Sequence, residues 1–342
     1  MEEGKIMNGY VSIVTGGAGF IGSHLTERLL REGYKVVILD NFSTGKLGNI
    51  QLSVDNPNLT IVKEDLKKTV KLNQIIKKCE IIFHLAANPE VRIGETDPKV
   101  HFEENILTTF NLLEAIRQAK TPKTIVFTST STVYGDASQI PTREDYAPLM
   151  PISTYGGSKL ACESLITSYA YTFNHRALIL RLANIIGPKS DHGVIVDFIR
   201  KIMVNPTALE ILGDGAQEKS YLHIADCIGA MMHLINKFRK GTQKVDVYNI
   251  GSYDKITVKE IAKIVAEEMD TPNIRYKFTG GVDGGRGWKG DVKTMQLSIN
   301  KILQTCWKPK YTSKQAVRLA AKALIKENLG SQKPKRKHYK EK

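Results

Sequence analysis

Tyr155 and Lys159 are the residues whose types and spacing point most directly to chemistry. They are four positions apart and are followed by helix formers, so both side chains lie on one helix face. A free tyrosine has a pKa of about 10, too high for a base at neutral pH, and a nearby ammonium favours the phenolate. Taken alone, the pair is typical of ordinary helix packing. The elements around it decide whether it transfers protons.

A run of hydroxyl side chains precedes the pair. Residues 128–132 read Thr-Ser-Thr-Ser-Thr and lie at the end of a predicted strand, Thr124 to Ser129. Hydroxyls at a strand end can hydrogen-bond a substrate, and they can equally cap a turn.

A glycine-rich stretch, Thr15 to Gly22, lies between an apolar run at Tyr10 to Val14 and an amphipathic run at Ile21 to Leu30. A strand, a glycine turn and a helix in this order present backbone N–H groups to a pyrophosphate. Gly16 suits the tight turn, Gly19 the close approach of phosphates, and Gly22 the packing of helix on strand.

Asp40 ends the next apolar run, Lys35 to Leu39, eighteen residues after Gly22. A carboxylate at this position can accept hydrogen bonds from the ribose hydroxyls of a dinucleotide. It would repel the 2′-phosphate of NADP, so the preferred dinucleotide is NAD. A glycine turn without a ligand is the alternative, and it does not account for Asp40.

Strands and helices alternate through the first half of the chain. This alternation predicts an α/β fold, a Rossmann-type doubly wound parallel sheet with helices on both faces. We expect a NAD-binding domain at 9–187, which carries Tyr155 and Lys159, a smaller α/β lid at 188–330, and a basic tail at 331–342. Further strands are expected at 59–62, 81–85 and 177–182, and helices at 70–78, 103–119 and 154–174. In the lid, strands are expected at 209–211 and 221–223, and helices at 227–236, 258–269 and 313–328.

Composition narrows the class of protein. The chain has 342 residues, 42% apolar and 25% charged, as in ordinary soluble proteins. No run approaches the roughly 18 apolar residues that span a bilayer, and the N-terminus does not resemble a secretory signal. The four cysteines follow no metal-ligand spacing. We expect a cytoplasmic protein without a metal or a membrane partner. Part of the net charge of +14 lies in the tail, and nucleic-acid binding is the less favoured use of it.

Together these features resemble the extended short-chain dehydrogenase/reductases. The resemblance rests on the glycine pattern, Asp40, His84-Leu85-Ala86-Ala87, Asn105, the hydroxyl run before Val133-Tyr134-Gly135, and Tyr155-Gly156-Gly157-Ser158-Lys159. Within them the chain is most similar to NAD-dependent nucleotide-sugar 4-epimerases of the UDP-glucose 4-epimerase type. Arg181 to Asn184, Gly213 to Gly215 and Tyr221 to Asp226 match landmarks of their substrate domain.

The resemblance implies reversible epimerisation at C4 of a UDP-hexose. The Tyr155 phenolate would take the proton of the 4-hydroxyl, Thr130 would hydrogen-bond that hydroxyl, and Lys159 would hold the nicotinamide ribose. A homodimer through the helices at 103–119 and 154–174 is also implied. The implied NAD-binding residues are Gly16, Gly19, Phe20, Ile21, Gly22, Asp40, Asn41, Ser43, Gly45, Asp65, Leu66, Leu85, Ala86, Ala87, Asn105, Tyr155 and Lys159. The implied substrate-binding residues are Thr130, Tyr155, Asn184, Lys219, Arg286, Asp291 and Met295.

The chain departs from the family pattern around the substrate diphosphate. Lys219 stands where the family has an arginine, and lysine binds phosphate as a point charge. Trp288 occupies the place of a second arginine, which leaves Arg286 as a substitute, and Leu182 replaces a common tyrosine. Met295 occupies the position that gates the space beside C2 of the sugar. It either admits an N-acetyl group or simply packs the lid.

Two other functions compete with epimerisation. A lyase of the same fold, a dehydratase or decarboxylase, is the first, but a dehydratase would carry acidic residues directly after Thr130. Ser131 and Thr132 stand there instead. A non-enzymatic dinucleotide-binding protein is the second, and such proteins usually lose the tyrosine or lysine that this chain retains.

Overall fold

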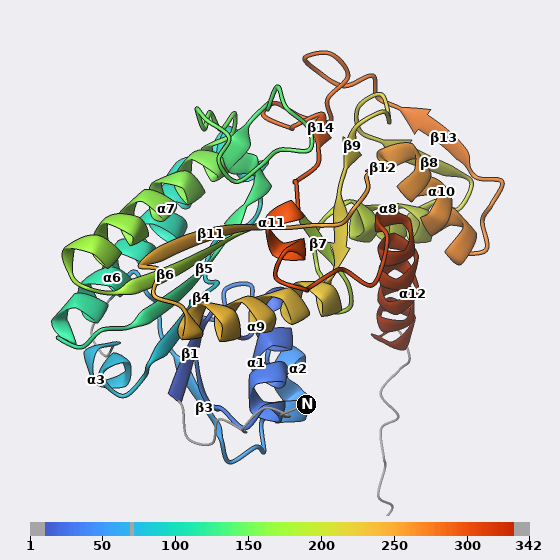
Figure 1. Ribbon diagram of the computed structural model, residues 1–342. Coiled ribbons are helices and arrows are strands. Elements are labelled where there is room, and N and C mark those ends of the chain that lie inside the picture. The colour runs from blue at the N-terminus through green and yellow to red at the C-terminus, as the bar shows by residue number, and fades with distance from the viewer. Residues whose placement is uncertain (1–10, 69–71, 332–342) are drawn as a thin grey trace, which may run out of the picture.

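A seven-stranded parallel sheet forms the centre of the molecule (Figure 1). The computed structural model of the chain describes residues 11–68 and 72–331; most of the predicted basic tail, 331–342, lies outside these residues. The strand order is β11-β6-β5-β4-β1-β2-β3, and the predicted α/β class is confirmed. The first half contains β1 (Val11–Thr15), α1 (Phe20–Arg31), β2 (Lys35–Asp40), α2 (Leu47–Ile50), η1 (Gln51–Ser53), β3 (Leu59–Lys63), α3 (Leu72–Lys77), β4 (Ile81–His84), α4 (Ile93–Thr96), α5 (Lys99–His101), η2 (Phe102–Leu107), α6 (Thr108–Gln118), β5 (Thr124–Thr130), η3 (Ser131–Tyr134), α7 (Thr154–Thr172), β6 (Arg176–Leu182) and β7 (Asn184–Ile186).

The second half forms a smaller unit beside the carboxyl ends of the strands, on the right in Figure 1. Its own core joins α8, α10 and α12 through apolar side chains that include Phe198, Ile261 and Leu324. The elements are α8 (Val194–Val204), β8 (Ala208–Ile211), β9 (Glu218–Lys219), β10 (Tyr221–His223), α9 (Ile224–Lys240), β11 (Val245–Ile250), β12 (Ile256–Thr257), α10 (Val258–Glu268), β13 (Arg275–Phe278), β14 (Thr294–Met295), α11 (Asn300–Leu303) and α12 (Ser313–Ser331).

Helices cover both faces of the central sheet. Figure 1 shows α6 and α7 on one face and α1 and α9 on the other. The strands are buried on both sides, and near-continuous apolar runs such as that of β6 follow from this. The chain reverses its order between β1 and β4, and ligands of doubly wound sheets bind outside the carboxyl ends at such a point.

One strand differs from the expected division of the chain at residue 188. β11 comes from the range 188–330, yet it pairs in parallel with β6 and forms the edge of the central sheet. The helix before it, α9, packs against α1. The range 188–330 therefore contains a helix and a strand that complete the sheet layer. Pairing over such a sequence separation leaves no local signal in the chain, and the boundary at 188 stays a prediction.

Two further elements differ from the expectation. The helix expected from Glu103 begins with a π-helical stretch, η2, before the regular turns of α6. α8 is not among the predicted helices, although Ile195, Phe198, Ile199 and Ile202 are buried along one face of it. No helix among the described residues is long and apolar enough to cross a membrane.

Candidate active site

A cavity of about 850 Å³ lies between the carboxyl ends of the central strands and the second-half unit. Its volume is within the usual range for small-molecule and cofactor sites. Most of the predicted site residues line it, from both halves of the chain. They are Gly16, Gly19, Phe20, Ile21, Gly22, Asp40, Asn41, Ser43, Asp65, Leu66, Leu85, Ala86, Ala87, Thr130, Tyr155, Lys159, Asn184, Lys219, Asp291 and Met295. Gly45, Asn105 and Arg286 are not among the lining residues.

Gly16 and Gly22, at the two ends of the turn after β1, have no room for a side chain. Gly16 has a φ of +67°, and a Cβ there would lie 2.9 Å from the backbone nitrogen of Ala86. A Cβ on Gly22 would collide with the carbonyl oxygen of Gly16. The first turn of α1, which starts at Phe20, therefore opens directly into the cavity with its backbone N–H groups. Such a turn is suited to holding a pyrophosphate.

Asp40 ends β2 with its carboxylate buried and held by the backbone. Its two oxygens accept hydrogen bonds from the amides of Ala18, at 2.9 Å, and Phe42, at 2.8 Å. A Cβ on Gly45 would lie 2.9 Å from both oxygens, so glycine is the residue that lets this loop cover the carboxylate. Each oxygen keeps a second lone pair, which is what the ribose hydroxyls require.

Tyr155 projects into the cavity from the first turn of α7. Ser153 starts this helix, where its hydroxyl accepts a hydrogen bond from the amide of Gly156. Burial raises the pKa of Tyr155 to about 12, although a hydrogen bond with Thr130 acts in the opposite direction. The lowered pKa expected from the charge of Lys159 is not found, because loss of hydration is the largest effect on Tyr155 and raises its pKa.

Lys159 is fully buried one turn further along α7. Burial lowers its pKa to about 8, and the neighbouring Cys162 and Glu163 act in the opposite direction. Its ammonium lies 4.3 Å from the ring centroid of Phe127 on β5, a cation–π contact that replaces part of the lost hydration. The ammonium therefore titrates close to neutral pH while lining the cavity.

His84, at the end of β4, is a structural residue beside the site. Thr15 donates to its Nδ1 at 2.8 Å, because the Thr15 oxygen already accepts the amides of Leu85 and Ala86. The Nε2–H donates to Thr109, whose own proton goes to the carbonyl of Asn105. Burial lowers the His84 pKa to about 3, so the ring is neutral and fixes the end of β4.

Asn105 acts from behind the cavity wall. Its Oδ1 accepts the amide of Asn88, and its Nδ2 donates to Ser158 at 2.9 Å. Ser158 donates in turn to the carbonyl of Tyr155. Asn105 therefore ties the loop after β4 to the first turn of α7, and its position indicates a supporting role for the site.

A buried ion pair holds α7 against the sheet. Arg181 of β6 contacts Glu163 of α7 at 2.8 Å, and both side chains are less than a tenth exposed. Ser129 of β5 donates to the same carboxylate at 2.5 Å. Arg181 also donates to the Tyr134 hydroxyl. This network holds α7, which carries Tyr155 and Lys159, against β5 and β6.

Arg286 and Lys219, the two residues expected to bind the substrate diphosphate, differ in their position relative to the cavity. Arg286 donates to Asp136 and to the carbonyl of Asp291, and it lies outside the cavity lining, so the structure does not support it as the substitute phosphate ligand. Lys219 lines the cavity and pairs with Asp291 at 2.5 Å. Its ammonium lies 5.5 Å from the ring centroid of Trp288.

Some lining residues lie outside the predicted set. Glu90 and Arg92 follow β4 in the loop that Asn105 holds, and the segment 189–198 leads from β7 into α8. The position of Glu90 and Arg92 shortly after a predicted strand end is a signal that sequence reasoning can use. The segment 189–198 offers no comparable signal, because its approach to the cavity depends on how α8 packs.

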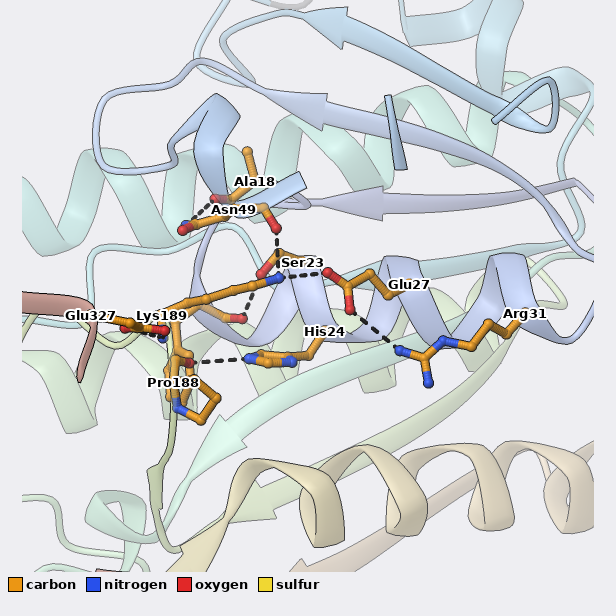
Figure 2. Close-up of polar contacts among 10 residues, drawn as sticks. Ala18, Ser23, His24, Glu27, Arg31, Asn49, Pro188, Lys189 and Glu327 are labelled. Carbon is orange, nitrogen blue, oxygen red and sulfur yellow. Dashed lines mark hydrogen bonds and ion pairs between the residues drawn. The ribbon is translucent and has the colours of Figure 1, made fainter. Parts of the chain in front are cut away.

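Lys189 joins this segment to the rest of the molecule. Figure 2 shows its ammonium reaching Glu27 of α1 and the backbone carbonyl of Asn49 in α2, each at 2.6 Å. Its amide faces the carboxylate of Glu327 in α12. The carbonyl of Pro188 contacts the ring of His24, also in α1 (Figure 2). The segment therefore crosses beside the first turns of α1, where the cofactor end of the cavity lies.

The residues present fit NAD. Gly16, Gly19 and Gly22 line the cavity at the start of α1, where the helix N-terminus would face the phosphates. Asp40 is placed for ribose hydroxyls and Lys159 lies deeper in the same cavity. Among residues 11–68 and 72–331, no cluster of three or more His, Cys, Asp or Glu side chains is arranged to hold a metal ion.

Comparisons with known proteins agree with this geometry. Residues 12–251 match the NAD dependent epimerase/dehydratase family. The chain is 32% identical over 310 residues to a putative UDP-glucose 4-epimerase of Methanocaldococcus jannaschii, covering 90% of this chain and 95% of that one.

Two solved structures extend the likeness to the fold. A UDP-galactose 4-epimerase structure is 42% identical with a TM-score of 0.81, and the match covers 93% of this chain and 99% of that one. UDP-glucuronic acid 4-epimerase from Bacillus cereus, in complex with UDP-glucuronic acid and NAD, is 29% identical with a TM-score of 0.82 over the same shares of the two chains. The chain therefore belongs to the NAD-dependent epimerase/dehydratase family of the extended short-chain dehydrogenases, and its cofactor is NAD.

Proposed function

We propose that the protein interconverts the C4 epimers of a UDP-hexose, with UDP-glucose and UDP-galactose as the main pair. The observation that carries the proposal is the meeting of Tyr155, Thr130 and Lys159 with the glycine turn in one cavity closed by a second unit. A proton acceptor beside a dinucleotide site is what reversible oxidation of an alcohol requires. A cavity of about 850 Å³ leaves room for the oxidised sugar to turn.

The residues of this chain act in a fixed order. Thr130 hydrogen-bonds the sugar 4-hydroxyl and directs it to Tyr155, whose oxygen takes the hydroxyl proton. Lys159 holds the nicotinamide ribose and adds positive charge near the phenol. When bound, NAD would supply the acceptor and donor of hydride for C4 of the sugar. The Lys159 ammonium would favour the phenolate of Tyr155, against the burial that raises the pKa of this phenol.

The product decides between epimerisation and the lyase alternatives. Ser131 and Thr132 line the cavity after Thr130, and their hydroxyls supply no acid–base pair for removing water from C5 and C6. We expect UDP-glucose to give UDP-galactose with no change of mass. NMR and mass spectrometry of the reaction mixture measure this. A product lighter by one water would mean a dehydratase. Loss of carbon dioxide from UDP-glucuronic acid would mean a decarboxylase.

Met295 is the residue proposed to determine which substituents at C2 of the sugar the site accepts. It lines the cavity from β14 and is 9% exposed, packed with Val133, Tyr134 and Leu297. An unbranched side chain adapts its shape, so we expect measurable turnover of UDP-N-acetylglucosamine. Met295→Tyr should depress that activity and spare UDP-glucose. A parallel loss of both activities, or no N-acetyl turnover in the unmodified protein, would mean that Met295 only packs the lid.

The proposal includes a homodimer formed through α6 and α7. These helices, with the turn before α6, expose several large side chains to solvent: Phe102, Phe110, Tyr171 and Phe173. An isolated exposed aromatic needs no explanation, but several on adjacent helices favour an interface. Sedimentation of the purified protein checks the stoichiometry. The same proposal places the protein in the cytoplasm.

A further inference from the structure

The end of the cavity that would hold the sugar can be traced through hydrogen bonds from the catalytic tyrosine. Tyr155 is linked through Ser158 and Asn105 to Asn88, as described above. The side chain of Asn88 then accepts the amide of Glu90 at 3.1 Å. This chain of contacts connects Glu90 to Tyr155, and Glu90, Arg92 and Tyr155 all line the same cavity. The side chains of Arg92 and Glu90 are 50% and 37% exposed.

Glu90 engages the guanidinium of Arg92. Its Oε1 accepts from the Arg92 Nε at 3.0 Å and from the Arg92 amide at 3.2 Å, and Oε2 lies 3.4 Å from Nη2. Burial would raise the Glu90 pKa, but these hydrogen bonds outweigh it and hold the pKa below its usual value. Glu90 is therefore ionised at neutral pH and occupies one fork of the arginine.

The rest of the surroundings of Arg92 is also defined. Its guanidinium carbon lies 5.7 Å from the ring centroid of Trp288, on the opposite wall. The carboxylate of Asp197 in α8 helps to raise the pKa of Arg92, and His192 helps to lower the pKa of Glu90. Asp197 pairs with Lys201 at 3.0 Å, and Lys201 also reaches Glu210 at 3.5 Å. Of the two carboxylates near Arg92, Glu90 is the one that hydrogen-bonds its guanidinium. The sugar end therefore contains an arginine whose charge is already matched.

We infer that Glu90 selects the sugar by charge, so that the site takes a neutral hexose and disfavours a uronic acid. The inference rests on the proposed function and names its substrate class. A carboxylate at C6 would meet the carboxylate of Glu90 and an arginine that is already engaged. Without Glu90, Arg92 presents its planar fork to the cavity, a geometry suited to a carboxylate. Glu90 is then a specificity-determining residue.

Binding measurements on the NAD-loaded protein test this inference. Calorimetric titration compares UDP-glucose, UDP-glucuronic acid and UDP. The unmodified protein should prefer UDP-glucose over UDP-glucuronic acid by about tenfold or more, and Glu90→Gln should shift the ratio toward the uronate by about tenfold. The affinity for UDP should not change, because UDP has no sugar. Adding Arg92→Gln to the Glu90 variant should cancel the shift.

A matched control separates this local effect from a change in net charge. Glu95→Gln removes the same charge from an exposed position in α4 outside the cavity lining, and should leave the ratio unchanged. Equal binding of the two sugars by the unmodified protein overturns the inference. So does an unchanged ratio in Glu90→Gln, or the same shift in Glu95→Gln. If UDP-glucose and UDP both fail to bind, the proposed function itself fails.

Discussion

At the scale of single residues, burial controls the two groups assigned to proton transfer. Tyr155 and Lys159 both lose hydration, which raises the pKa of the phenol to about 12 and lowers that of the ammonium to about 8. Each shift favours the neutral form of its group.

Tyr155→Phe tests the role of the phenol. The change removes the proton acceptor and leaves the glycine turn intact, so NAD should remain bound. Turnover should fall by at least the factor of about 10² to 10⁴ that general base catalysis supplies. Initial rates with UDP-glucose measure the loss, and bound NAD is quantified after denaturation. A variant that keeps more than about a tenth of the activity contradicts this role.

The pH dependence of cofactor binding tests Lys159. Its folded pKa of about 8 lies below the ordinary value, so the ammonium loses its proton as pH rises through 8. The affinity of the NAD-stripped protein for NAD should therefore weaken from pH 7 to pH 9. Lys159→Met should bind NAD more weakly at pH 7 and show no such step. A flat profile in the unmodified protein would mean that the charge of Lys159 does not contribute to binding.

At the scale of elements, α7 packs against the sheet through a buried charge as well as through apolar side chains such as Ile166 and Ala170. Glu163 lies on the face of α7 that packs against the sheet, and it forms an ion pair with Arg181 of β6. Removing one partner of such a pair is far more costly than replacing both, because a lone charge is left in a dry site.

Arg181→Met should lower the free energy of unfolding by about 3–5 kcal/mol. The double change with Glu163→Gln should recover part of this loss, since no charge then stays buried. Urea unfolding of the three variants measures both effects. A single variant that loses less than about 1 kcal/mol would show that water reaches Glu163.

At the scale of the whole molecule, few polar contacts join the segment after β7 to α1 and α2, and Lys189 makes two of them. Its backbone has a φ of +67°, uncommon for a residue other than glycine. Contacts of the ammonium with Glu27 and Asn49, and of the backbone amide with Glu327, hold this conformation (Figure 2). The segment lines the cofactor end of the cavity, so its attachment bears on how tightly NAD is held.

Lys189→Met should speed the release of NAD without changing the catalytic groups. The Lys189–Glu27 pair is only 20% and 15% exposed, whereas the Lys46–Asp191 pair of the same region is 61% and 40% exposed. Exposed pairs contribute little, so Lys46→Met is the matched control and should leave release unchanged. Exchange of bound NAD against labelled NAD gives the rates. Equal rates in the two variants would contradict a role for Lys189 in retention.

The sequence by itself determined the features that depend on neighbours along the chain. The glycine turn between β1 and α1, the carboxylate at the end of β2, and the i, i+4 pair on α7 each leave a local pattern. A strand is known from its own apolar run, and parallel strands in a βαβ order align their carboxyl ends. That rule is enough to bring Gly16, Asp40 and Thr130 to one edge of the sheet.

Only the tertiary structure decided what depends on pairing across the chain. β11 joins the sheet beside β6, and Arg286 pairs with Asp136, 150 residues away, instead of facing the cavity. Burial of Tyr155 reverses the pKa shift that its distance from Lys159 along the helix suggests. Which surfaces pack together decides the partner of each charged group and how much water it loses. The strength of a charge interaction depends on this burial more than on spacing along the sequence.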